Sequence, residues 1–107
     1  DAEEIQLQIE KEVYVSDKVL DYIMAIINKT RRNGYITAGL STRGALTLMT
    51  TAKANAYFHG RDFVIPEDIK ELIEFTIPHR VLFKEEYESL DKREIIKSLI
   101  EEIPTPV

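Results

Sequence analysis

Residues 60–69 carry the strongest local signals in this chain, with the sequence Gly60-Arg61-Asp62-Phe63-Val64-Ile65-Pro66-Glu67-Asp68-Ile69. Gly60 stands where a glycine commonly adopts the left-handed conformation after a helix. Pro66 suits the first position of the next helix, because that position needs no backbone N–H. Glu67 and Asp68 would then lie in the first turn, where the helix dipole favours negative charge. The stretch therefore predicts one helix ending just before Gly60, an extended connection, and a second helix beginning at Pro66.

The helix before this connection is predicted to begin at Ser41 and to run to His59. The hydroxyl of Ser41 can accept a hydrogen bond from a backbone N–H of the first turn, as helix N-caps do. The apolar positions recur three or four residues apart and are mostly small, namely Ala45, Leu48, Met49, Ala52 and Ala56. Such a face lets another helix approach closely.

Further helices are predicted on both sides of this pair. Residues 1–11 form a short polar helix, and Ser16 caps a helix that runs to about Thr30 with an apolar stripe of Val19, Leu20, Ile23, Ile26 and Ile27. Residues 31–40 are expected to be a loop, and the helix from Pro66 to end before Pro78. A last helix is predicted over 92–103, capped by Asp91, with Ile95, Ile96, Leu99, Ile100 and Ile103 facing inward. The pattern predicts one all-α domain over residues 1–107, a bundle of about four to five helices.

The composition is that of a globular domain, with 44% apolar and 31% charged residues. No apolar run approaches the roughly 20 residues that span a bilayer, and the acidic start is unlike a secretory signal. Cysteine is absent, so disulfides and thiolate metal sites are excluded. We therefore expect a cytoplasmic protein with no membrane partner. Because the chain begins without Met, we also expect a piece of a longer protein.

The charge is divided unevenly along the chain. The net charge of −5 argues against nucleic acid as a partner, since phosphate binding needs a surplus of cations. The segment 22–61, called here the basic segment, nevertheless contains none of the Asp and Glu residues; its six cations are Lys29, Arg31, Arg32, Arg43, Lys53 and Arg61. Such a segment can meet an anion or an acidic surface. It can equally neutralise the acidic ends of the same fold.

Catalytic and metal-binding motifs are missing from the sequence. The four glycines are too scattered to form a phosphate-binding loop of the Gly-x-x-x-x-Gly-Lys-Ser/Thr kind. His59 and His79 have no carboxylate at a metal-ligand spacing, and we expect no metal site. The isolated domain is therefore predicted not to be an enzyme.

One element could bind an anion. Ser41, Thr42 and Arg43 would place a hydroxyl, the free N–H groups of a helix N-terminus and a guanidinium within one turn. The N–H groups attract an anion, and the arginine fork matches phosphate oxygens. The alternative is a capped helix with an exposed arginine.

Four stretches, in this order and spacing, resemble the C-terminal lid domain of MoxR-type AAA+ ATPases. They are Val13-Tyr14-Val15-Ser16-Asp17, Gly39-Leu40-Ser41-Thr42-Arg43-Gly44-Ala45, the stretch 60–69, and Pro78-His79-Arg80. The resemblance extends over essentially the whole chain, including the closing helix before Pro104. It implies that an α/β core domain precedes this lid in the parent protein and binds ATP and Mg²⁺ there, with no cofactor expected in this fragment alone.

The resemblance also implies a role for Arg43. In the family's Ser-Pro-Arg element the arginine is the sensor 2 residue, which reaches the γ-phosphate of the bound nucleotide. The resemblance places Arg43 at that position, with Ser41 and Thr42 beside it as further nucleotide-binding residues. This chain has Thr42 where the family usually has proline, and Gly44 where it has alanine, which should loosen the turn. The implied partners are the core domain of the same chain, neighbouring subunits of a ring, and proteins with von Willebrand A domains. The resemblance also implies that the parent ATPase acts as a chaperone-like machine.

Two other functions remain open from the sequence. The chain could be a stand-alone helical module whose basic segment docks on an acidic protein. It could also be a helix-turn-helix DNA binder that reads with the helix after Ser41. That helix is otherwise rich in Ala, Thr and Leu, and Arg43 and Lys53 are its only basic residues that could contact DNA bases. Nucleic acid is therefore not expected as a partner.

Overall fold

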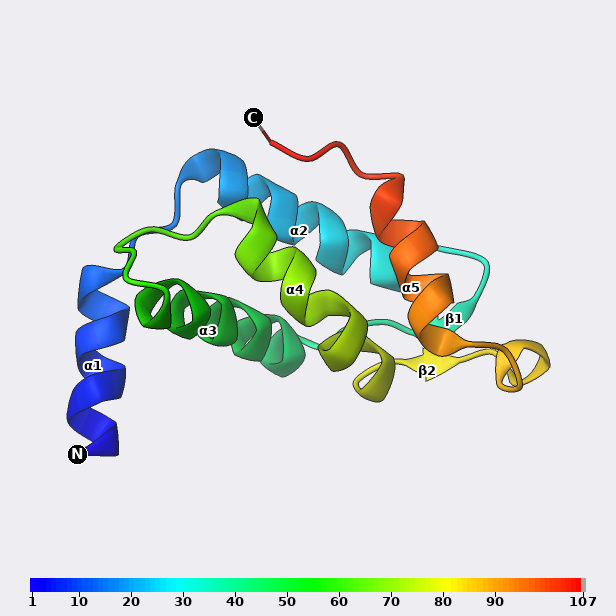
Figure 1. The fold of residues 1–107 in the computed structure, drawn as a ribbon. Helices are drawn as coiled ribbons and strands as arrows, with labels where there is room; N and C mark the ends of the chain where they lie inside the picture. Colours follow the sequence, from blue (N-terminus) through cyan, green and yellow to red (C-terminus); the bar gives the residue numbers. More distant parts are fainter. Residues whose placement is uncertain (107) are drawn as a thin grey trace.

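The computed structural model describes residues 1–106, which fold mainly into helices (Figure 1). In this range there are five α-helices: α1 (Ala2–Glu12), α2 (Asp17–Arg31), α3 (Thr42–Phe58), α4 (Pro66–Thr76) and α5 (Lys92–Glu101). Two short 3-10 turns, η1 (Ile77–His79) and η2 (Glu85–Tyr87), follow α4 and precede α5. The strands β1 (Ile36–Ala38) and β2 (Leu82–Phe83) pair as a small antiparallel sheet. The prediction of a small helical bundle is confirmed.

The helix ends agree with the local signals. The hydroxyl of Ser16 accepts from the N–H of Val19 at 3.3 Å, and the carboxylate of Asp91 accepts from Arg93 N–H at 3.0 Å. Pro66 is the first residue of α4. Gly60 has φ +77, the left-handed conformation expected after α3. These starts and stops were predictable because each depends on residues within one turn.

Two expectations need correction. The segment 31–40 is not loop throughout, because it contains β1, which pairs Ile36 with Phe83. Both of these side chains are buried, so the pairing covers apolar surface at the edge of the bundle. In α2, Leu20 was expected in the buried apolar stripe but is 37% exposed. Tyr22 is buried in its place, with 3% of its surface exposed. The helix is therefore turned slightly from the orientation that the aliphatic pattern suggested.

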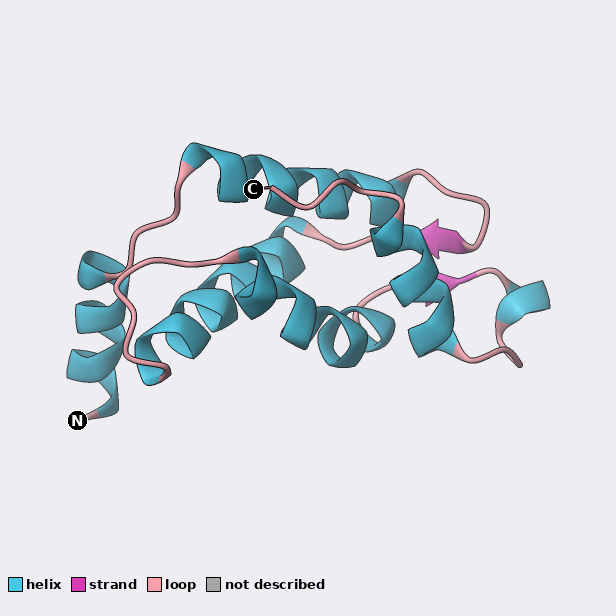
Figure 2. Cartoon of the chain, turned by 45° about the horizontal axis from the view of Figure 1, so that its top comes forward, coloured by secondary structure: helices cyan, strands magenta, loops and turns pink. Residues whose placement is uncertain are grey.

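The core lies between α2, α3, α4 and α5, as two views show (Figures 1 and 2). Its fully buried members include Ile23, Ile26, Leu48, Ile69, Ile73 and Ile96. Ala52 and Ala56 of α3 are also completely buried, and α4 packs against this small-residue face as predicted. α1 packs against α3 at one end of the molecule, and the β1–β2 pair lies at the other. Within residues 1–106, no helix has the length and apolar character needed to cross a membrane.

Candidate functional site

The candidate anion-binding turn lies at the start of α3. Ser41 is the N-cap, Thr42 the first helical residue and Arg43 the second, and all three are exposed. The hydroxyl oxygen of Ser41 accepts from the N–H of Gly44 at 3.1 Å, as predicted for a cap. Among the residues described, the guanidinium of Arg43 makes no hydrogen bond or ion pair with the protein. Arg43 therefore presents an unengaged cation beside the positive end of a 17-residue helix.

The turn is fixed to the end of α2 through the backbone of Leu40. The Leu40 N–H donates to the hydroxyl oxygen of Thr30 at 3.0 Å, and the Leu40 carbonyl accepts from Nε of Arg31 at 2.9 Å. Thr30 in turn donates to the carbonyl of Ile27 at 2.7 Å. Thr30 and Leu40 are each 1% exposed. The two peptide groups that flank the Cα of Leu40 are thus each held by a side chain of α2, just before the candidate turn.

Close packing at two glycines supports the same arrangement. A Cβ at Gly39 would lie 2.5 Å from the carbonyl oxygen of Thr30 and 2.6 Å from Cα of Arg31. Gly44 is buried, and a Cβ there would lie 2.9 Å from Cδ1 of Leu40. Glycine at position 44 therefore lets the first turn of α3 pack closely on Leu40.

The structure divides the basic segment into two groups. Lys29 pairs with Glu102, Arg31 binds the Leu40 carbonyl, and Arg61 pairs with Asp68. Arg32 and Arg43 are exposed, and Lys53 is half-buried. Three of the six cations therefore bind groups within the fold, which leaves fewer charges for an acidic docking partner than the sequence suggested.

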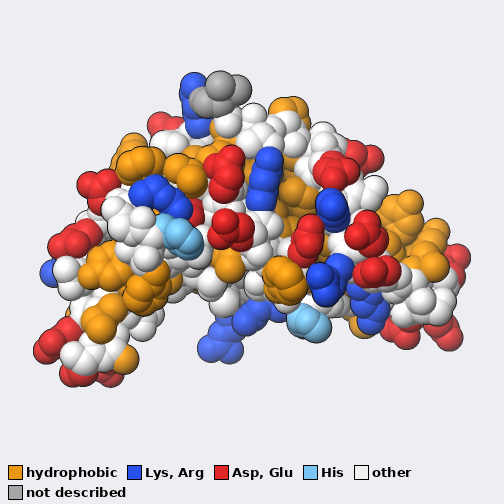
Figure 3. All heavy atoms as spheres, viewed as in Figure 1, with side chains coloured by type: hydrophobic (Ala, Val, Ile, Leu, Met, Phe, Trp, Pro, Cys, Tyr) orange, Lys and Arg blue, Asp and Glu red, His pale blue; other side chains and the backbone are white. Residues whose placement is uncertain are grey.

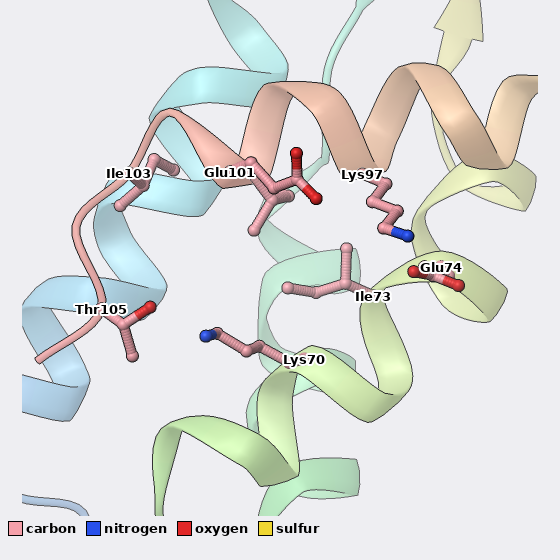
Figure 4. Close-up of a pocket in the computed structure, with 8 residues that line it drawn as sticks. Lys70, Ile73, Glu74, Lys97, Glu101, Ile103 and Thr105 are labelled. Carbon is pink, nitrogen blue, oxygen red and sulfur yellow. The ribbon is translucent and has the colours of Figure 1, made fainter.

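The groove between α4 and α5 is the hollow with the most charged lining, and its side chains are drawn in Figure 4. Its volume is about 210 Å³, with Ile73 and Ile100 among its apolar lining residues. Lys70 and Lys97 are offset there by Glu74 and Glu101. Nucleotide sites need a cationic surplus, and ligand pockets usually exceed about 300 Å³. This groove is therefore a poor nucleotide site.

A larger hollow of about 490 Å³ lies between α1 and α3. Its lining is mostly apolar and includes Ile5, Ile9, Ala54 and Phe58. Hydrophobic side chains also gather over this end of the molecule in the space-filling view (Figure 3). Neither hollow is lined by Ser41, Thr42 or Arg43. In residues 1–106, no three His, Asp or Glu side chains are grouped so as to hold a metal ion.

The exposed cation at the start of α3 thus stands on a rigid turn outside both hollows, so a second body would be needed to enclose a nucleotide against it. Residues 28–99, which include this turn, match the family model described as "AAA lid domain". This chain belongs to the AAA lid domain family. The matched range contains α3, α4 and the whole Leu40 connection, so the family assignment covers the candidate site itself.

Two relatives and one solved structure extend this assignment of the AAA lid. The chain is 37% identical over 97 residues to the uncharacterized protein YeaC of Bacillus subtilis, which covers 89% of this chain and 30% of that protein. It is 28% identical over 78 residues to the chaperone MoxR1 of Mycobacterium tuberculosis, covering 64% of this chain and 21% of that one. A crystal structure of a candidate ATPase from Cytophaga hutchinsonii superposes with a TM-score of 0.83 at 32% identity, over 94% of this chain and 34% of that chain. The AAA lid described here is of the MoxR type, and it spans 21–34% of the length of these proteins.

The sequence singled out the turn but not the contacts that hold it. Thr30 and Arg31 were not assigned to the site, although Gly39-Leu40 follows them at a distance that permits a closed loop. A buried threonine at a helix end is a usable signal, because its hydroxyl must find partners once water is excluded. The position of that hydroxyl relative to Leu40 depends on the path of the intervening loop.

Proposed function

We propose that this AAA lid is the C-terminal lid of a longer MoxR-type ATPase and that Arg43 is its sensor 2 residue. The observation that carries the proposal is the unengaged, exposed guanidinium of Arg43 on a turn held firmly by α2. The lid would cover a nucleotide bound by the core domain of the same chain. ATP and Mg²⁺ belong to that core domain, and the lid supplies no metal ligand.

The chemistry suits an arginine in this place. As the bond to the γ-phosphoryl group breaks, negative charge spreads over its oxygens, and a positioned guanidinium stabilises that charge more in the transition state than in the ground state. The N–H groups at the start of α3, together with the hydroxyls of Ser41 and Thr42, add donors at the same place. The lid alone should bind ATP poorly, because it offers this one phosphate contact.

A single arginine also links nucleotide state to domain movement. The lid and the core domain would be separate rigid bodies, so a contact from Arg43 to the γ-phosphate would hold them closed until hydrolysis removes it. Such rotation in a ring would pass to neighbouring subunits, and the relative named as a chaperone suggests chaperone-like work on client proteins. Partners with von Willebrand A domains are part of the same proposal.

The test is ATP turnover by the full-length protein carrying Arg43→Ala. We expect turnover to fall about 10²-fold, the usual cost of removing a donor that stabilises transition-state charge. Arg32→Ala is the matched control, because Arg32 is an exposed cation of the same segment, and it should leave turnover within about twofold. Unchanged turnover in Arg43→Ala would rule out the sensor 2 assignment.

A further inference from the structure

Leu40 is the only residue between β1 and α3 whose backbone N–H and backbone carbonyl are both bound by side chains of α2, within the residues described. Thr30 accepts from the N–H at 3.0 Å, and Arg31 donates to the carbonyl at 2.9 Å. The two side chains come from successive residues at the C-terminal end of α2. They therefore act on Leu40 as one clamp, called here the Leu40 clamp.

Close contacts around the Leu40 clamp leave little room for its backbone to move. The Thr30 hydroxyl is buried and uses its proton on the Ile27 carbonyl, so its oxygen is oriented toward Leu40. Gly39 lies so close to the backbone of Thr30 and Arg31 that no other residue fits there without a shift. The side chain of Leu40 is buried, and Gly44 packs onto it. The start of α3 consequently has a fixed relation to the end of α2.

We infer that Thr30 and Arg31 are positioning residues for Arg43. Only Ser41 and Thr42 separate the clamped residue Leu40 from Arg43, and Ser41 is itself fixed as the N-cap. A small change in the backbone dihedral angles of Leu40 would therefore move the first turn of α3, and the Arg43 guanidinium with it. Arg31 acts through its Nε on the Leu40 carbonyl. This inference rests on the proposed sensor 2 role of Arg43.

The residue beside the clamp provides a matched comparison. Arg32 has the same charge and follows Arg31 directly, but it is exposed and its side chain binds nothing in residues 1–106. Arg31→Met keeps most of the side-chain length and removes the donor, so it should disturb the clamp, whereas Arg32→Met should not. Thr30→Val removes the hydroxyl at nearly constant volume, and Thr30→Ser keeps it.

The experiment measures steady-state ATP hydrolysis by the full-length ATPase with each variant, alone and combined with Arg43→Ala. We expect Arg31→Met and Thr30→Val each to lower kcat about tenfold or more, because small misplacements of a catalytic group are costly, with Arg32→Met and Thr30→Ser near the parent protein. In the Arg43→Ala background, Arg31→Met should change kcat less than twofold, since the group it positions is already gone. A purely structural role would lower kcat by the same factor in both backgrounds.

The outcomes separate the two proposals. If Arg43→Ala lowers turnover but Arg31→Met does not, or if their effects multiply, the positioning role is wrong and the sensor 2 role stands. If Arg43→Ala has no effect, both are wrong. Arg31→Met keeps the inference testable even if Thr30→Val fails to fold, because the Arg31 side chain lies at the surface.

Discussion

Asp68 accepts hydrogen bonds from both terminal nitrogens of Arg61, at 2.8 and 2.6 Å, with only 1% of Asp68 exposed. The same carboxylate accepts from Asn55 Nδ2 at 3.0 Å and from the N–H of Ile65 at 2.9 Å. Two residues of the stretch 60–69 are thus joined across the α3–α4 connection. The arginine in this stretch supports the fold and leaves no free charge for a ligand.

Arg61→Met should lower the free energy of unfolding by about 3 kcal/mol. The substitution keeps apolar volume but leaves the Asp68 carboxylate buried without its cation, and breaking one side of a buried ion pair typically costs about 3–5 kcal/mol. Urea denaturation of this chain and of the variant measures the difference. Lys29→Met is the matched control, because its partner Glu102 is largely exposed, and the loss should stay below about 1 kcal/mol. Equal losses for the two variants would contradict the structural role of the Arg61–Asp68 pair.

The helices were predictable from the sequence because their signals are local. Ser41, Gly60 and Pro66 each act within one turn, and each takes the predicted role. The pairing of Ile36 with Phe83 was missed because its two partners are far apart in the chain and each strand is too short to show an alternating pattern.

The candidate site was predictable only in part, for the same reason. Residue type marked Arg43, since a guanidinium near a helix start carries a chemical meaning by itself. The roles of Lys29, Arg31 and Arg61 depend on which oxygen the fold brings to each, and no local pattern indicates that Arg31 faces the Leu40 carbonyl.

Gly39→Ala should destabilise the chain by about 1–3 kcal/mol, the usual cost of overpacking. The new methyl group would lie 2.5 Å from the carbonyl oxygen of Thr30, and backbone atoms cannot rotate away as a flexible side chain can. Gly34→Ala is the control, because a Cβ at Gly34 has no neighbouring atom within 4 Å. Thermal or urea unfolding measures both. A Gly39 variant as stable as the Gly34 variant would show that the loop does not pack on α2 as described.

Arg43→Ala should change the free energy of unfolding of this chain by no more than about 0.5 kcal/mol. The side chain is exposed and binds nothing within residues 1–106, and surface substitutions of this kind usually have small effects. The backbone carbonyl of Arg43, which accepts from the Thr47 hydroxyl at 3.0 Å, is unaffected by the change. Urea denaturation gives the value. A loss above 1 kcal/mol would mean that lower ATP turnover in this variant has a structural origin.

Tyr22→Phe should leave the chain as stable at neutral pH or stabilise it by up to about 1 kcal/mol. The Tyr22 hydroxyl is buried and no group in residues 1–106 meets hydrogen-bond geometry with it, although the Thr105 side chain is near enough to affect its pKa. A buried polar group without a well-formed hydrogen bond costs free energy that phenylalanine avoids. Tyr14→Phe, at a side chain that is 64% exposed, is the control and should be neutral. Destabilisation by more than 1 kcal/mol would reveal a partner for the hydroxyl.

The same substitution should alter the pH dependence of stability at high pH. Burial raises the pKa of the Tyr22 phenol above its ordinary value of 10.0, the charge of Glu67 raises it further, and Thr105 opposes both. Above about pH 10 the unfolded chain therefore releases a proton that the folded chain retains, so the contribution of Tyr22 to stability is complete below that pH and is lost as the pH rises. Urea denaturation at about pH 8 to 11 should show a steeper decline for the parent chain than for Tyr22→Phe. Parallel curves for the parent and Tyr22→Phe would mean that the phenol ionises as easily in the folded chain as in the unfolded one, and that the hydroxyl is reached by water.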